Sequence, residues 1–381
     1  MIWWNNLRLK SKDPQARCKA VESLAGTNDP HAIEPLVASL EDVNAQVRQA
    51  AAQALGNFRD PVSTDALITV LRDSNEGVCQ TAANSLGRLG DARAINPLVR
   101  TLKDGASNVR ASAASALRHL GWKPSSEEET ALFEIATGHA KAALHAGKAA
   151  VVPLVNELKN DTGFQRRAAA EALEGVNDTR RIQPLLAAAR DPDFTVRVSA
   201  IYALANETSG EVATMLVSTF RDQDRQVRLA AAEVLAKWED PAYMPCFFEL
   251  LADSHFEVRL TAVKFLAKRR DPAAADVLVP LMQDADSDVR LAVAQVLGAV
   301  GSPIAIEALV LAMTDEERTV RDAAGRALDQ IDVNWHGTEA AQRAAARLEL
   351  LLQDKRAWVC SAAMQVLNRL RSPDGQIHLE S

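Results

Sequence analysis

The dipeptide Val-Arg recurs seven times, and its last five copies are each 31 residues apart: Val47-Arg48, Val109-Arg110, Val196-Arg197, Val227-Arg228, Val258-Arg259, Val289-Arg290 and Val320-Arg321. A fixed period of this size indicates a chain of stacked structural repeats. One repeat of 31 residues is too small to bury its own apolar surface, so neighbouring repeats must cover each other. We therefore expect a solenoid with a long continuous surface and no single enclosed pocket.

The residues around each arginine position fall on one side of a helix. Leucine stands seven residues after it in all eleven repeats that can be aligned, and alanine stands three residues after it in all but one, where Val293 is found. Offsets of −1, +3 and +7 from the arginine position form one stripe of an α-helix. We predict that this stripe is the core and that the small alanine lets neighbouring helices approach closely. The leucines are Leu24, Leu55, Leu86, Leu117, Leu173, Leu204, Leu235, Leu266, Leu297, Leu328 and Leu367.

A shorter helix is expected before each of these helices. Proline recurs 13 residues before the arginine position, where the first turn of a helix tolerates it, at Pro35, Pro97, Pro153 and Pro184. Aspartate recurs six residues before the arginine position, in the turn between the two helices, at Asp42, Asp104, Asp191, Asp222, Asp253, Asp284 and Asp315. The fixed spacing predicts a ladder of bidentate arginine–aspartate pairs along the stack. We expect interruptions where Cys79 and Cys360 replace the arginine and where Gln165 replaces the valine.

The repeated pattern Asp…Val-Arg…Ala…Leu-Gly resembles the HEAT-repeat family, in the short bacterial form named after phycobilisome lyases, over roughly residues 13–370. This resemblance implies an all-α, right-handed α-α superhelix of about eleven helical hairpins. Such repeats occur in scaffolds and in a few enzymes, so the resemblance implies the fold and leaves the activity open.

Breaks in the period suggest a division of the chain. We predict an N-terminal aromatic cap at 1–12, repeats one to four at 13–120, a helical insert at 121–149, repeats five to ten at 150–330, an insert with the last repeat at 331–370, and a mobile tail at 371–381. Ser126 and Glu129 resemble a capping box that opens a helix over 127–136, and a second helical stretch is expected near 139–146. The inserts either carry specificity in surface loops or only redirect the stack.

Composition excludes several classes of function. The net charge of −7 and the pI near 5.6 argue against a nucleic-acid partner. Four distant cysteines without a Cys-x-x-Cys pair argue against zinc sites and disulfides. The sequence contains neither an apolar run of about 18 residues nor a start like a signal peptide, so we expect a cytoplasmic protein without a membrane span. Trp3 and Trp4 either cap the first repeat or make a weak peripheral contact with a membrane.

We find no residues that would form a catalytic, cofactor or metal site. The single glycines Gly56, Gly87, Gly90 and Gly121 fit left-handed helix caps better than phosphate loops. Deoxyhypusine hydroxylase, an iron enzyme built from similar repeats, uses repeated His-Glu pairs as metal ligands, and this sequence has none. Two enzymatic alternatives stay open through the resemblance alone, a bilin (phycobilisome) lyase and a hydroxylase-like oxidoreductase.

One surface stands out as a candidate for partner binding. The position after the arginine is apolar in four successive repeats, and we call this row the leucine face: Val198, Leu229, Leu260 and Leu291. Polar residues, Tyr202, Glu233 and Lys264, follow four residues later, and Arg269 adds a nearby positive charge. We expect a concave face that binds a protein or peptide, such as an amphipathic helix, with the apolar row as anchor and Glu233, Lys264 and Arg269 setting the register. Alternatively, a neighbouring helix covers the leucines. We expect a monomer.

Overall fold

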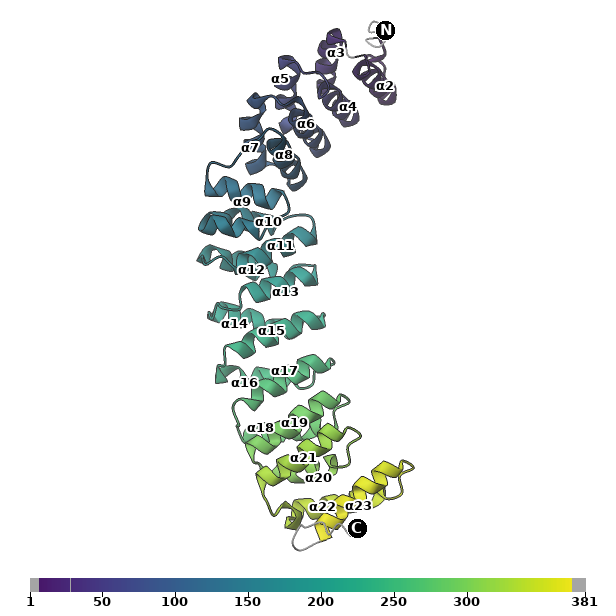
Figure 1. Ribbon diagram of the computed structural model, residues 1–381, viewed down its shortest axis with the longest axis vertical. Coiled ribbons are helices and arrows are strands. Elements are labelled where there is room, and N and C mark those ends of the chain that lie inside the picture. The colour runs from purple at the N-terminus through teal and green to yellow at the C-terminus, as the bar shows by residue number, and fades with distance from the viewer. Residues whose placement is uncertain (1–6, 28, 372–381) are drawn as a thin grey trace. The chain divides into compact units, whose positions relative to one another are not determined.

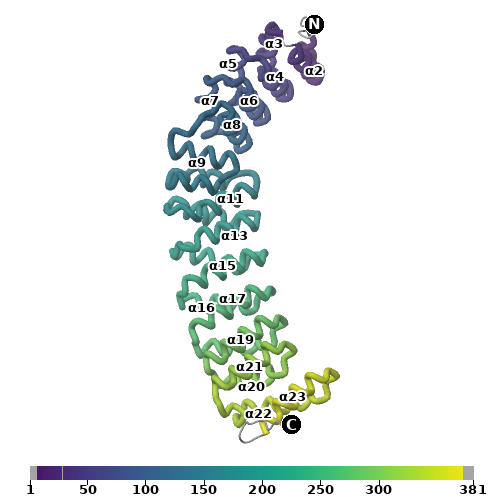
Figure 2. The backbone as a smooth tube through the Cα atoms, viewed as in Figure 1, coloured from purple at the N-terminus to yellow at the C-terminus, as the bar shows by residue number. Residues whose placement is uncertain are grey.

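The computed structural model describes residues 7–27 and 29–371, and every regular element within these ranges is helical. The chain divides into two compact units, unit 1 at residues 1–203 and unit 2 at residues 204–381. In each unit a first helix, a turn and a second helix alternate along the chain (Figures 1 and 2). The predicted all-helical solenoid is therefore confirmed. The predicted roles of Trp3, Trp4 and the tail from residue 372 fall outside the described residues.

Unit 1 contains six second helices and five first helices, with an insert between α8 and α10. Its second helices are α2 (Pro14–Ala25), α4 (Ala45–Leu55), α6 (Glu76–Leu89), α8 (Ser107–His119), α11 (Gly163–Glu174) and α13 (Phe194–Ala203). Its first helices are α3 (Ile33–Ala38), α5 (Pro61–Thr69), α7 (Ile95–Asp104), α10 (Val151–Glu157) and α12 (Ile182–Ala188). The insert contains α9 (Glu127–Ala136) and the 3₁₀ helix η5 (Ala142–Ala150), and the other 3₁₀ turns are η1 (Pro30–Ala32), η2 (Ser39–Glu41), η3 (Val70–Arg72), η4 (Ala92–Ala94) and η6 (Thr179–Arg181).

Unit 2 continues the same alternation. Its second helices are α15 (Arg225–Lys237), α17 (Phe256–Ala267), α19 (Ser287–Val300), α21 (Arg318–Ile331) and α23 (Ala357–Arg371). Its first helices are α14 (Gly210–Thr219), α16 (Met244–Leu250), α18 (Ala273–Leu278), α20 (Ile306–Ala312) and α22 (Glu339–Leu351). The 3₁₀ turns are η7 (Pro241–Tyr243), η8 (Val279–Gln283), η9 (Pro303–Ala305) and η10 (Trp335–Gly337).

The predicted stripe of valine, alanine and leucine forms the core of both units. In α15, Val227, Ala231 and Leu235 are all 0% exposed. Successive second helices contact each other along this stripe, as α15, α17, α19 and α21 do in unit 2 (Figure 1). The Leu-Gly dipeptide that ends the pattern has a packing role, because a Cβ on Gly87 would lie 2.9 Å from the Cα of Ala116 on the next second helix.

Two of the four expected left-handed glycine caps are wrong. Gly90 and Gly121 have φ angles of 77° and 70°, as predicted. Gly56 has a φ of −62°, and Gly87 lies inside α6 without a positive φ. At both positions a side chain would collide with the neighbouring second helix, so glycine serves close helix packing there.

The insert between α8 and α10 begins as predicted and then differs. Helix α9 spans Glu127–Ala136, and the Ser126 hydroxyl accepts a hydrogen bond from the Glu129 amide at 3.2 Å. The Glu129 carboxylate accepts hydrogen bonds from Ser125, so the capping box is only half formed. The expected second helix near 139–146 is instead the 3₁₀ segment η5, which is broken at Gly147 with φ 54° and ψ −130°.

The eight extra residues before the last repeat do more than form a loop. Trp335 is only 2% exposed, and its indole Nε1 donates to the Asp329 carboxylate at 3.1 Å. The following first helix, α22, has 13 residues, whereas α20 has 7. The extra residues therefore bury an aromatic ring beneath the last repeat and precede a longer first helix.

The predicted arginine–aspartate ladder joins each repeat to the next. We define a rung as the pair between an arginine on one second helix and the aspartate 25 residues later, in the turn of the following repeat. In every rung the arginine Nε and Nη2 each donate to one carboxylate oxygen, at 2.6–2.9 Å. The rungs are Arg17–Asp42, Arg48–Asp73, Arg166–Asp191, Arg228–Asp253, Arg259–Asp284 and Arg290–Asp315.

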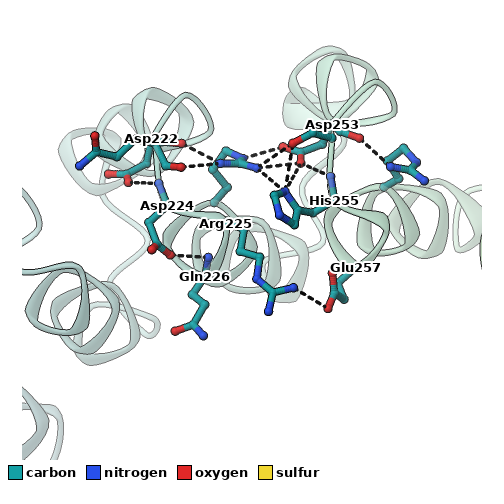
Figure 3. A network of polar contacts seen from close by, with 11 residues as sticks. Asp222, Asp224, Arg225, Gln226, Asp253, His255 and Glu257 are labelled. Carbon is teal, nitrogen blue, oxygen red and sulfur yellow. Dashed lines mark hydrogen bonds and ion pairs between the residues drawn. The ribbon is translucent and has the colours of Figure 1, made fainter.

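Each arginine also bonds to its own repeat. The Nη1 of Arg228 donates to the Asp222 carbonyl oxygen at 2.9 Å, while its other nitrogens hold Asp253, so one guanidinium links two turns (Figure 3). The Asp253 carboxylate also accepts the His255 backbone amide at 2.8 Å. The side chains of Arg228 and Asp253 are 9% and 8% exposed, so this rung lies in a largely water-excluded place.

Two of the three expected interruptions occur. The Cys79 and Cys360 thiols each donate to the carbonyl oxygen six residues earlier, at 3.2 and 3.1 Å, and neither makes a rung. The interruption expected at Gln165 is wrong, because the adjacent Arg166 still pairs with Asp191 at 2.7 Å. At the insert, Arg110 pairs with Glu157 in place of an aspartate.

The rungs hold their carboxylates ionised. Hydrogen bonds from Arg48, which outweigh burial, place the pKa of Asp73 below its ordinary 3.8. Burial raises the pKa of Asp253 and Asp284, but the arginine and backbone hydrogen bonds together outweigh it, so both pKa values also lie below 3.8.

We expect Asp253→Asn to lower the free energy of unfolding by about 3 kcal/mol, because it leaves the buried Arg228 guanidinium without its counter-charge. Urea denaturation followed by circular dichroism measures the change. The control is Arg225→Ala, which removes the exposed Arg225–Glu257 pair at 3.3 Å and should cost about 0.5 kcal/mol. Equal effects of the two substitutions would contradict a structural role for the rung.

Stability should fall in acid. A carboxylate whose pKa is lower in the folded than in the unfolded chain stabilises the fold above its unfolded pKa, and this contribution disappears as the pH falls through the folded pKa. We therefore expect the melting temperature to decline below about pH 5 and to keep falling below 3.8, the ordinary value for Asp73, Asp253 and Asp284. The decline should be smaller in Asp253→Asn, and an identical pH profile would count against the ladder as its source.

Candidate interaction surface

The leucine face is divided between the two units. Val198 and Tyr202 lie on α13 in unit 1, whereas Leu229, Leu260 and Leu291 lie on α15, α17 and α19 in unit 2. The three leucines occupy the same position on three successive second helices that contact one another. The structure therefore brings together the unit 2 part of the leucine face.

These leucines are neither core nor fully exposed. Leu229, Leu260 and Leu291 are each half-buried, whereas Val227, two positions before Leu229, is 0% exposed. Val198 and Tyr202 are half-buried on their own unit. Partial burial is expected for side chains in a surface row whose flanks are shielded by the longer polar side chains of the same helices.

Charged residues border the row in unit 2. Arg225 on α15 donates to the Glu257 carboxylate on α17 at 3.3 Å, and this ion pair is partly exposed beside the leucines (Figure 3). Glu233 is half-buried, and Lys264 is exposed one turn beyond Leu260. The Arg225–Glu257 pair was missed from the sequence, although an arginine three residues before one rung position and a glutamate two residues before the next were visible.

Arg269 takes part in contacts within the chain. It lies beyond the end of α17, where its guanidinium stands 4.2 Å from the centre of the Phe265 ring and donates to the Glu239 carbonyl oxygen. Lys268 beside it pairs with the Glu239 carboxylate at 2.5 Å. Much of the positive patch predicted around Arg269 is therefore engaged in local contacts.

The described residues offer little for catalysis. Within 7–27 and 29–371, no three or more histidine, cysteine or acidic side chains are grouped so that they could hold a metal ion. In the same ranges, no helix combines the length and the apolar character needed to cross a membrane.

Comparisons with known proteins agree with the repeat pattern. The model of HEAT repeats matches residues 6–83, 33–118, 64–146, 213–294 and 277–368, and that of the PBS lyase HEAT-like repeat matches residues 165–191. No curated protein matches the sequence.

Two solved structures are similar in extent but not close in shape. An engineered protein is 23% identical, with 97% of this chain and 99% of that chain covered and a TM-score of 0.33. Human deoxyhypusine hydroxylase in complex with glycerol is 22% identical, with 87% and 96% covered and a TM-score of 0.28. At these scores neither likeness bears on function. The family models, by contrast, cover most of the chain in overlapping segments, and the helices alternate in hairpins joined by the ladder. The chain belongs to the HEAT-repeat family.

Proposed function

We propose that the protein is a non-enzymatic scaffold or adaptor of the cytoplasm that binds a protein or peptide on the leucine face. The observation that supports this most directly is the row of half-buried leucines on α15, α17 and α19, bordered by the Arg225–Glu257 pair and by Lys264. The ladder and the core use the other positions of these helices, so the row is not required for stacking.

The dimensions suit a short helical ligand. With neighbouring helices about 10 Å apart, the two steps from Leu229 to Leu291 span about 20 Å. A helix of about 13 residues has this length. Apolar residues at every third or fourth position of such a helix would pack on the leucines, and its polar residues would meet Glu233 and Lys264. We infer that the leucines supply the affinity and the charged residues the register.

We expect Leu229→Asp with Leu260→Asp to abolish partner capture, because two carboxylates would replace the apolar anchors. An affinity capture from the native cytosol compares this variant with the wild type. The matched control is Ala111→Asp with Ser361→Asp, which adds the same charges at exposed residues in the same repeat position outside the leucine face. Circular dichroism must show unchanged helix content. A double variant that unfolds would show that the leucines are core residues, and unchanged capture would move the binding site elsewhere.

The enzymatic alternatives are separated by two simple measurements. We expect purified protein to contain much less than one iron per chain by elemental analysis, because the described residues offer no clustered metal ligands. Stoichiometric iron would instead favour the hydroxylase-like alternative. A lasting change in bilin absorbance after mixing with the protein would favour the lyase.

A further inference from the structure

The ladder is incomplete at Cys79, and a cavity of about 520 Å³ lies at this place in unit 1. Its lining includes residues from both repeats that the missing rung would have joined. They are Arg72, Asp73, Cys79, Arg100, Asp104 and Val109. A volume of this size is within the range of small-ligand sites.

The intact rungs show which groups a guanidinium would meet there. Each ladder arginine donates to the carbonyl oxygen six residues earlier and to the carboxylate 25 residues later. For position 79 these groups belong to Asp73 and Asp104. The Cys79 thiol reaches the Asp73 carbonyl at 3.2 Å and makes no bond to Asp104. The lining therefore contains both acceptors of a rung without the guanidinium that would join them.

A second cavity between repeats shows what an intact rung does. In unit 2 a cavity of about 420 Å³ lies between η8 and α20 and reaches Asp315, whose carboxylate is held by Arg290. No residue of the second helices α19 and α21 lines it. At the Cys79 position the lining continues inward to Cys79 and to Val109, which is 3% exposed. The shorter side chain has thus opened the cavity towards the second helices.

The charges in the cavity leave one carboxylate available. Asp73 is already held by Arg48 at 2.7 Å. Asp104 ends α7, is exposed, and forms no ion pair with any basic residue in the part of the chain that the structure describes. Arg72 and Arg100 are likewise without an ion pair among the described residues. They oppose a second positive charge on a ligand, whereas a neutral amide or a carboxylate at its far end is compatible with them.

We propose that this cavity binds the guanidinium group of an arginine, which takes the place of the missing ladder side chain. The planar fork of donors pairs with the Asp104 carboxylate as Arg228 pairs with Asp253, and lysine, a point charge, cannot reproduce this geometry. The guanidinium belongs either to free arginine or to an arginine side chain of a polypeptide. The site lies in unit 1 and is independent of the leucine face.

Ligand-observed saturation-transfer NMR on the full chain tests the proposal. The probes are Nα-acetyl-L-argininamide, which represents an arginine within a polypeptide, and L-arginine, which represents the free amino acid. The controls are L-citrulline, which has a similar shape without the charge, and L-lysine. We expect at least one arginine probe to bind at least tenfold more tightly than both controls, and the stronger probe identifies the source. Absence of binding by both arginine probes would overturn the proposal.

Four variants locate the site. Asp104→Asn should weaken binding about tenfold or more, as loss of a charge-assisted pair implies. Cys79→Ala should keep it, because the thiol is not the acceptor. Cys79→Arg should abolish it and raise the melting temperature, because the new side chain completes the rung. The matched control is Cys360→Arg, which changes the same residue type at a position with no aspartate 25 residues later and should alter neither property.

Undiminished binding in Asp104→Asn or in Cys79→Arg would contradict the proposed site. If Asp104→Asn fails to fold, Cys79→Arg decides, since its added side chain competes directly with the ligand. A fully folded Cys79→Arg variant that binds the arginine probe as the wild type does would place the ligand elsewhere.

Discussion

The bidentate pair between an arginine and the aspartate of the next repeat is the interaction on which the stack depends most. Apolar contacts along the stripe of Val227, Ala231 and Leu235 are strong but not directional, so they do not by themselves fix how one hairpin sits on the next. A guanidinium that binds one turn through Nη1 and the next through Nε and Nη2 has only one satisfactory placement. The ladder therefore supplies register, and the stripe supplies most of the free energy of folding.

This division of roles determines which surface can serve binding. On a second helix, the stripe and the ladder arginine occupy one side, and glycine or alanine allows the next helix to approach, as Gly87 does with Ala116. The opposite side carries no duty in stacking. Leu229, Leu260 and Leu291 lie there, and their apolar character in successive repeats is best explained by a surface kept for a partner.

Much of the fold was predictable because the period places the same residue in the same environment many times. Leu235 could be assigned to the core and Asp253 to the turn from spacing alone. Gly87 could not be interpreted correctly, since a glycine that permits close packing and one that caps a helix look alike in sequence. The broken 3₁₀ segment around Gly147 also has no repeat to compare with. For the site, spacing found the leucines, but the engagement of Arg269 by Phe265 and Glu239 depends on the local path of the chain.

The substitution at Cys79 suggests a general route by which a periodic scaffold gains selectivity. A new binding site usually requires several side chains to be placed correctly at once. In a chain where every repeat already positions a carboxylate and a carbonyl for an internal cation, shortening one side chain leaves that arrangement in place for an external one. Recognition can then arise by subtraction, through a single change, and its chemistry is inherited from the contact that was lost.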